Sequence, residues 1–202
     1  MTKLSSSEIK GIESVRYFAK ICESQWCKPI LPWIIRGYEP TEDSPRTYHN
    51  IFHIETVCRH IPTDAAPELM LAALAHDIVY VPMSKDSEER SCLAIQEFLG
   101  VEIPLVTKYI LATKHDSTET DRNSQILCDA DLAVLGGSWE EYQRYVMAVR
   151  QEFDVPDSDW RKGRSDWITS VLQKDQIYYR LTDLESPARS NLQKELAYLS
   201  ES

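Results

Sequence analysis

Glycine is scarce in this chain and its cysteines follow no pairing pattern, and both features limit the fold classes that are open to it. Only 6 of the 202 residues are glycine, which disfavours glycine-rich phosphate loops and β folds rich in tight hairpins. The five cysteines are odd in number and include no CxxC or CxxH pair. A disulfide framework and a structural zinc finger are therefore not expected.

Long apolar runs and positive charge are also limited. No stretch approaches the roughly 18 apolar residues of a membrane span, and the first residues lack the apolar core of a signal peptide. We therefore expect no membrane partner and a reduced, cytoplasmic location. Lys and Arg number 22 against 32 Asp and Glu, a net charge of −10. This balance argues against a nucleic-acid polymer as partner but allows a local pocket for a small phosphorylated ligand.

What the chain does have is helical periodicity over most of its length. The length suits a single domain, 1–202, of the all-α class, with a core over about 46–136 and C-terminal helices over about 138–199. Because a surface stripe and a dimer interface look alike in a helical sequence, a homo-oligomer stays open. We expect helices over 8–25, 47–61, 66–80, 86–99, 104–115, 123–135, 138–153, 157–174 and 186–199, and irregular connections at 26–46, 81–85, 116–122 and 175–186.

Polar groups whose burial is unfavourable occur within the apolar runs of these predicted helices. His76 and Asp77 follow the run APELMLAALA, and Asp131 lies in QILCDADLAVLG. A buried carboxylate is unfavourable unless it is paired or bound to a cation. Together with His53, these residues supply two imidazoles and two carboxylates from three helices. That mixture suits one divalent ion, with Mn, Mg, Fe, Co, Ni and Zn all left open.

An ordered series of motifs resembles the HD superfamily of metal-dependent phosphohydrolases, in particular a branch of predicted HD phosphohydrolases. The motifs run from residue 46 to 191: R-x-Y-H-N-x-x-H-I (46–54), A-x-x-H-D-x-V-Y (73–80), S-E-E-x-S (87–91), A-T-K-H (112–115), D-A-D-L-x-x-L-G (129–136), V-R-Q-E-F (149–153) and E-x-x-A-R-x-N (185–191). Tyr48 to His53 is also similar to the cyclic-nucleotide phosphodiesterases of the same wider group. The resemblance implies a single helical HD-type domain.

The resemblance also implies site residues. His53, His76, Asp77 and Asp131 would hold the metal, and His49 would donate a proton to the leaving group. His49 in place of His53, and Asp129 in place of Asp131, remain open as ligands.

Further residues are implied around that metal set. Glu88, a catalytic candidate with His49 and Asp77, would orient the attacking water. Arg46, Lys114 and His115 are candidates for binding phosphate, and His115 could instead hold a second ion. One ion is expected, since the best-defined two-metal branches use two such histidines. We expect His60 at the surface, and Trp160 and Trp167 in the core.

These features predict a hydrolase that cleaves a phosphoester of a small metabolite or nucleotide with a metal-activated water. Whether it is a phosphomonoesterase or a phosphodiesterase is open. Two alternatives are a non-catalytic HD domain that binds a nucleotide or metabolite and, with less support, a di-iron HD oxygenase. The oxygenase would require more histidines than this chain offers.

Overall fold

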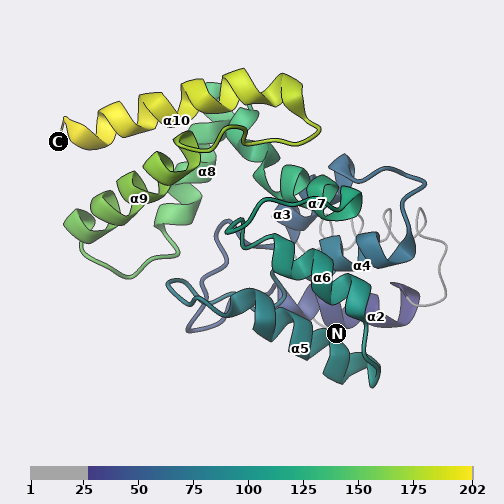
Figure 1. Ribbon diagram of the computed structural model, residues 1–202. Helices are drawn as coiled ribbons and strands as arrows, with labels where there is room; N and C mark the ends of the chain where they lie inside the picture. Colours follow the sequence, from purple (N-terminus) through teal and green to yellow (C-terminus); the bar gives the residue numbers. More distant parts are fainter. Residues whose placement is uncertain (1–26, 202) are drawn as a thin grey trace.

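Every regular element between residues 27 and 201, the part of the chain that this computed structural model describes, is a helix, which confirms the all-α class (Figure 1). The expected helix over 8–25 lies outside the described residues. The helices are α2 (Cys27–Gly37), α3 (Ile51–His60), α4 (Pro67–Ala75), α5 (Ser87–Leu99), α6 (Pro104–Ala112), α7 (Arg122–Leu132), α8 (Trp139–Arg150), α9 (Asp157–Leu172) and α10 (Glu185–Ser200), with short 3₁₀ turns η1 (Ala133–Gly136) and η2 (Thr182–Leu184). The one-domain prediction also includes residues outside this range and stays a prediction.

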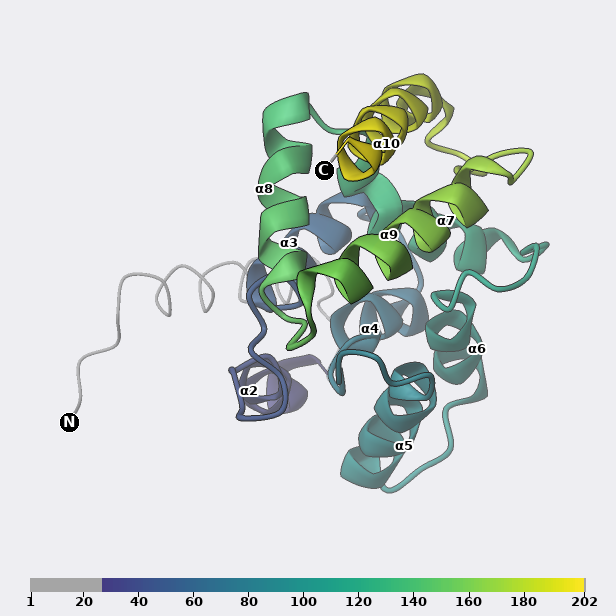
Figure 2. The same cartoon turned by 90° about the vertical axis from the view of Figure 1, so that its left-hand side faces the viewer.

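The described helices form two lobes, each with its own apolar core (Figure 1). Helix α4 is buried on all sides at the centre of the first lobe, where its apolar run is enclosed by α2, α3, α6 and α7. Burial of such side chains contributes about 1.5–3 kcal/mol each. The second lobe consists of α8, α9 and α10 around η1, and Figure 2 shows α9 and α10 beside α8.

Contacts between the segment before α3 and helix α8 join the two lobes. The Thr47 hydroxyl donates to the Ala148 carbonyl at 2.7 Å. The rings of Tyr48 and Tyr145 meet edge to face with centroids 4.7 Å apart. These contacts bring residues about 100 positions apart to one place, and the site described below lies there.

Helix α2 corrects the expectation of an irregular connection over 26–46. It contains Pro32, which cannot donate a backbone hydrogen bond and usually disfavours a helix interior. Ile30 and Ile34 are nonetheless almost fully buried against the first core. Burial of this apolar face outweighs the cost of the proline.

The helices that carry the candidate ligands are shorter than expected. Helix α3 begins at Ile51, because the Asn50 side chain caps it by accepting from the Phe52 N–H at 2.9 Å. His49 therefore precedes the helix and does not share it with His53. Helix α4 ends at Ala75, so His76 is its C-cap and Asp77 lies in the following turn. The starts of α5 to α10 agree with the expected ones within one residue, whereas α6, α7 and α8 each end three residues earlier than expected. The left-handed Gly100 ends α5 as expected (φ 69°).

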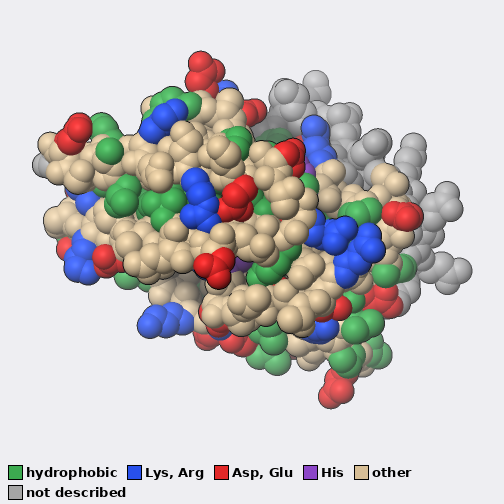
Figure 3. Space-filling view, turned by 45° about the horizontal axis from the view of Figure 1, so that its top comes forward, with side chains coloured by type: hydrophobic (Ala, Val, Ile, Leu, Met, Phe, Trp, Pro, Cys, Tyr) green, Lys and Arg blue, Asp and Glu red, His purple; other side chains and the backbone are tan. Residues whose placement is uncertain are grey.

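Charges of both signs mix on the face drawn in Figure 3, and green apolar side chains gather between α9 and α10. That face carries no broad basic patch of the kind that nucleic-acid polymers require. Among residues 27–201, no helix combines the length and the hydropathy that crossing a bilayer would demand.

Candidate metal centre

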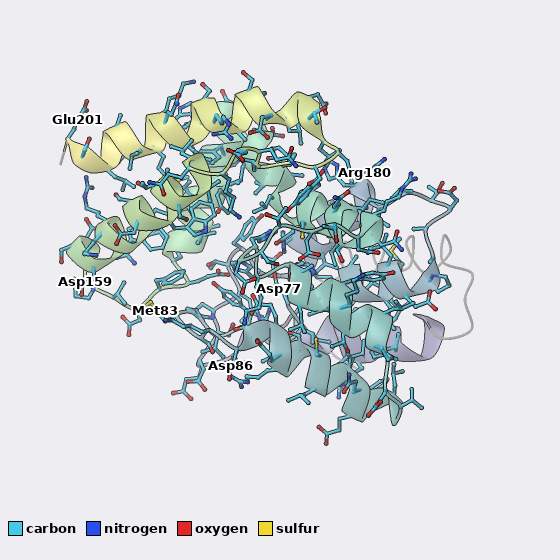
Figure 4. The ribbon with its side chains drawn as sticks, in the orientation of Figure 1. Asp77, Met83, Asp86, Asp159, Arg180 and Glu201 are labelled. Atoms are coloured by element: carbon cyan, nitrogen blue, oxygen red, sulfur yellow. The ribbon has the colours of Figure 1, made fainter. Side chains whose placement is uncertain are left out.

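Four side chains from three parts of the first lobe converge at one point. His53 comes from α3, His76 and Asp77 from the turn after α4, and Asp131 from the last turn of α7. One ligand atom from each of them lies within 4.8 Å of all the others. Figure 4 shows Asp77 between the two lobes. These are the four residues that the sequence predicts as ligands.

The two histidines present bare ring nitrogens to the carboxylates. His53 Nε2 lies 3.2 Å from Asp131 Oδ1 and 3.5 Å from Asp77 Oδ2. His76 Nε2 lies 3.3 Å from Asp77 Oδ2 and 3.5 Å from Asp131 Oδ1. Both Nε2 atoms are buried and neither has a hydrogen bond of acceptable geometry. An unsatisfied buried nitrogen is costly, so two facing the same point indicate a ligand between them.

The orientation of His76 also suits a metal. Its Nδ1 lies 3.0 Å from the Ala73 carbonyl oxygen. Because a carbonyl can only accept, Nδ1 donates to it, and in the neutral ring this tautomer leaves the Nε2 lone pair facing the cluster. Metal-bound histidines are held in this way by a hydrogen bond from the opposite ring nitrogen.

The electrostatics of the cluster favour a cation. Burial by itself would raise the pKa of Asp77 and of Asp131, but the surrounding imidazoles hold both well below the usual range. Burial likewise opposes the charged form of His53 and His76, and the two carboxylates more than offset it and raise both pKa values. The two aspartates are therefore ionised at one buried point, where a divalent ion fits the donor set of two nitrogens and two oxygens.

Asp129, the alternative to Asp131, has a different position. Its carboxylate accepts the backbone N–H groups of Tyr179, Arg180 and Leu181 at 2.6–2.9 Å. It therefore anchors the segment that leads from α9 to α10. His60 is exposed on α3, as expected, and lies outside the cluster.

His49 lies beside the cluster, with its ring centroid 5.8 Å from that of His53. Its Nδ1 is 2.6 Å from Glu152 Oε2, and its ring stacks on Tyr80 at 3.9 Å between centroids. Glu152 Oε1 also accepts the backbone N–H groups of Tyr48 and His49. Burial raises the pKa of Glu152, but His49 and these N–H groups outweigh it and lower the pKa overall. The ring is thus fixed through Nδ1, and Nε2 is the nitrogen left for a substrate.

His115 contacts the cluster through Asp131. Its Nε2 lies 2.9 Å from Asp131 Oδ2, the oxygen that faces away from His53 and His76. The residue adopts a left-handed backbone (φ 54°), and its carbonyl accepts from Lys174 Nζ at 2.7 Å. A strained backbone held in place by a tertiary contact fits a positioning role for His115.

The other predicted residues lie around this centre. The Arg46 guanidinium is buried and donates to the carbonyls of His49, Asp77 and Ile78 at 2.6–3.0 Å, so it braces the turn that carries Asp77. Lys114 Nζ bonds Glu89 Oε1 at 2.6 Å. Their roles as phosphate ligands stay predictions.

Glu88, in the first turn of α5, is half-buried. Desolvation chiefly, and the charge of Asp77 in addition, raise its pKa.

A cavity of about 680 Å³ opens beside the cluster and extends into the second lobe. His49, Tyr80, His115 and Asp131 line the end nearest the candidate ligands. Trp160 and Trp167, expected as core residues, line the cavity as well as packing in their lobe. The cavity walls include Tyr48, His49, Tyr80, Met83, Lys85, His115, Asp131, Leu132, Val134, Leu135, Tyr145, Val149, Phe153, Val155, Asp159, Trp160, Gly163, Arg164 and Trp167.

Glu152 and Arg164 are the site residues to which the sequence assigned no role. Glu152 belongs to the motif V-R-Q-E-F, and that match was its only signal. Arg164 is buried in the cavity wall and bonds Glu195 through two nitrogens, at 2.9 and 3.0 Å. No local pattern identifies either partnership, because 103 and 31 residues separate the partners.

Comparisons with protein-family models, with curated proteins and with solved structures found no match. The resemblance to HD phosphohydrolases therefore rests on the motifs themselves.

Proposed function

We propose that this protein is a metal-dependent hydrolase of the HD type that cleaves a phosphoester of a small molecule. The observation that carries the proposal is the pair of bare, buried imidazole nitrogens facing two ionised aspartates at the end of a cavity. A structural metal site would have no need of a cavity large enough for a substrate.

His53, His76, Asp77 and Asp131 would hold one divalent ion. When bound, such an ion lowers the pKa of a coordinated water toward neutrality and withdraws charge from a phosphoryl oxygen. His115 would keep Asp131 in place, because its Nε2 is committed to Oδ2 of that carboxylate. This commitment favours one ion over two.

His49 would serve as the general acid. When a phosphoester is cleaved, its alcohol portion departs as an alkoxide, which needs a proton. His49 lines the cavity beside the candidate ligands and could supply that proton. Glu152 holds the ring by Nδ1 and would stabilise the imidazolium that donates from Nε2. Glu88, half-buried in the first turn of α5, would orient the attacking water, a role that the resemblance implies.

Metal content tests the first part of this proposal. Protein purified without chelator should contain close to one equivalent of a divalent metal. The near-isosteric Asp77→Asn variant and His53→Ala should lose it. His60→Ala is the matched control, because it removes an exposed histidine from the same helix. Equal metal in His53→Ala and His60→Ala would contradict the assignment.

Turnover tests the second part. The metal-loaded protein should release phosphate from a panel of phosphomonoesters, or cleave phosphodiesters, and His49→Ala should lower kcat by roughly 10²–10⁴-fold. Metal retained without turnover on either panel would favour the non-catalytic binding domain. Iron-dependent oxygen uptake would favour the oxygenase.

A further inference from the structure

We propose that the phosphoester cleaved at this centre carries a large, apolar, aryl-type group, and that the far end of the cavity binds this group. This inference rests on the proposed function and adds the chemical class of its substrate. It excludes sugar phosphates and nucleotides as the preferred ligands.

The first support is the set of side chains in the cavity wall. Six aromatic residues contribute to it, and none of the lining residues is Asn, Gln, Ser or Thr. A nucleobase or a sugar placed against the apolar part of this wall would lose its hydrogen bonds to water without replacement there, at a cost of about 1–3 kcal/mol for each unpaired group. An apolar group has no such cost and gains from burial.

The second support is the position of the polar groups that the wall does contain. The Tyr80 ring stacks on His49, and the Tyr48 ring lies 4.8 Å from that of His53. Both tyrosines therefore lie at the end of the cavity nearest the candidate ligands. Lys85 and Asp159 are exposed. The wall contributed by the chain from the end of α8 through α9 includes the aromatic and aliphatic side chains of Val149, Phe153, Val155, Trp160 and Trp167.

The third support is Arg164, the one buried cation of the wall. Its guanidinium bonds Glu195 with two nitrogens and the Tyr145 hydroxyl with a third, at 3.1 Å. Its charge is thus neutralised, and its Cζ lies over the Trp167 ring, 4.4 Å from the ring centroid. Arg164 therefore holds the aromatic wall in place and is not available to anchor a phosphate. The phosphate would lie at the His49 and Asp131 end, and the organic group would extend toward Trp160.

The rim carries an exposed apolar side chain beside the charged Lys85 and Asp159. Met83 is 72% exposed, has a left-handed backbone (φ 70°) and contributes to the cavity wall. Figure 4 shows Met83 and Asp159 on opposite lobes at the same side of the molecule. An exposed methionine at a cavity entrance suits an apolar ligand, since its flexible thioether adapts to varied shapes.

Gly163 provides a sharp test. It lies in α9 and lines the cavity, and a Cβ added there would meet no atom within 4 Å. Gly163→Leu should therefore fill part of the cavity without disturbing the helix, because leucine is the better helix former. Lys162→Leu is the matched control, since it adds the same side chain one position away on an exposed part of α9.

Calorimetric titration of the full chain without added metal, using 2-naphthol and adenosine as probes, separates this inference from the proposed function. We expect 2-naphthol to bind the wild type and Lys162→Leu at least 10-fold more tightly than adenosine, and to lose at least 10-fold in affinity with Gly163→Leu. Adenosine binding as tightly as 2-naphthol, or unchanged affinity in Gly163→Leu, would overturn the inference.

Turnover of different phosphoesters tests the substrate class directly. With metal bound, 2-naphthyl phosphate should have a higher kcat/KM than AMP or glucose 6-phosphate, and Gly163→Leu should lower that preference. Hydrolysis of AMP in preference to the naphthyl ester would overturn the substrate class and leave the hydrolase proposal standing. Selective binding of 2-naphthol without any turnover would support the aryl-binding cavity and contradict the hydrolase proposal.

Discussion

His49 and Glu152 lie 103 residues apart in the chain, and their side chains meet at 2.6 Å between Nδ1 and Oε2. The contact crosses from the segment before α3 to the turn after α8 and so joins the two lobes at the candidate site. The same carboxylate accepts two backbone N–H groups of the segment that carries His49. The position of the proposed acid thus depends on the second lobe.

The first prediction concerns this pair. Glu152→Gln should lower kcat by about 10–100-fold with little change in KM, because His49 loses the charge that stabilises its imidazolium. The double variant with His49→Ala should be no slower than His49→Ala alone, since both act through one proton transfer. Multiplicative losses in the double variant would contradict the coupling.

The second prediction separates the two aspartates of the D-A-D motif. Asp131→Asn should remove bound metal and leave the fold intact. Asp129→Asn should retain metal and lower the free energy of unfolding by about 2–3 kcal/mol, because an amide cannot replace a carboxylate that accepts three N–H groups. Elemental analysis and urea unfolding of both variants check this contrast. The opposite pattern would identify Asp129 as the ligand.

The third prediction concerns His115. His115→Ala should weaken metal affinity by roughly 10–100-fold without abolishing binding, as expected for a residue that holds a ligand by a hydrogen bond. Competition with a chelating dye measures the change, and His60→Ala should show none. Complete loss of one of two bound ions would instead assign His115 to a second metal.

The fourth prediction concerns the Asp121 cap of α7, the helix that carries Asp131. Its carboxylate accepts the N–H groups of Asn123 and Ser124. Asp121→Ala should lower the free energy of unfolding by about 1 kcal/mol at pH 7. Asp121→Asn keeps a capping oxygen and should lower it by less. Equal losses in the two variants would contradict the capping role.

The pH dependence of that cap has a definite sign. The Ser124 N–H and Lys108 lower the pKa of Asp121 below its usual 3.8. Its ionic contribution is therefore complete above about pH 3.8 and is lost as the pH falls through the lower, folded-state value. The advantage of wild type over Asp121→Asn should shrink over that acidic range in thermal unfolding. An advantage that grew on acidification would contradict the shift.

The one-dimensional pattern of the chain was enough for the helical class, most helix boundaries and the four residues that converge. Apolar periodicity reports which face of a helix is buried, and an Asp or His inside an apolar run stands out because its burial is costly. His76, Asp77 and Asp131 stood out for that reason, whereas the preference for His53 over His49 and for Asp131 over Asp129 came from the resemblance to HD phosphohydrolases. Helix α2 was not expected from the sequence. Pro32 disfavours a helix interior, and only the packing of Ile30 and Ile34 reveals that burial compensates.

Tertiary structure alone decided the partners of the site. Glu152 and Arg164 are charged residues in amphipathic segments, where a solvent-facing role is the ordinary expectation. Their function arises from contacts with His49 and Glu195 in distant parts of the chain. The cavity is equally non-local, because its walls come from both lobes and its apolar character depends on which faces of α8 and α9 turn inward. Local sequence determines helices and the cost of burial, whereas the cavity beside the candidate metal centre is set by how separate helices pack together.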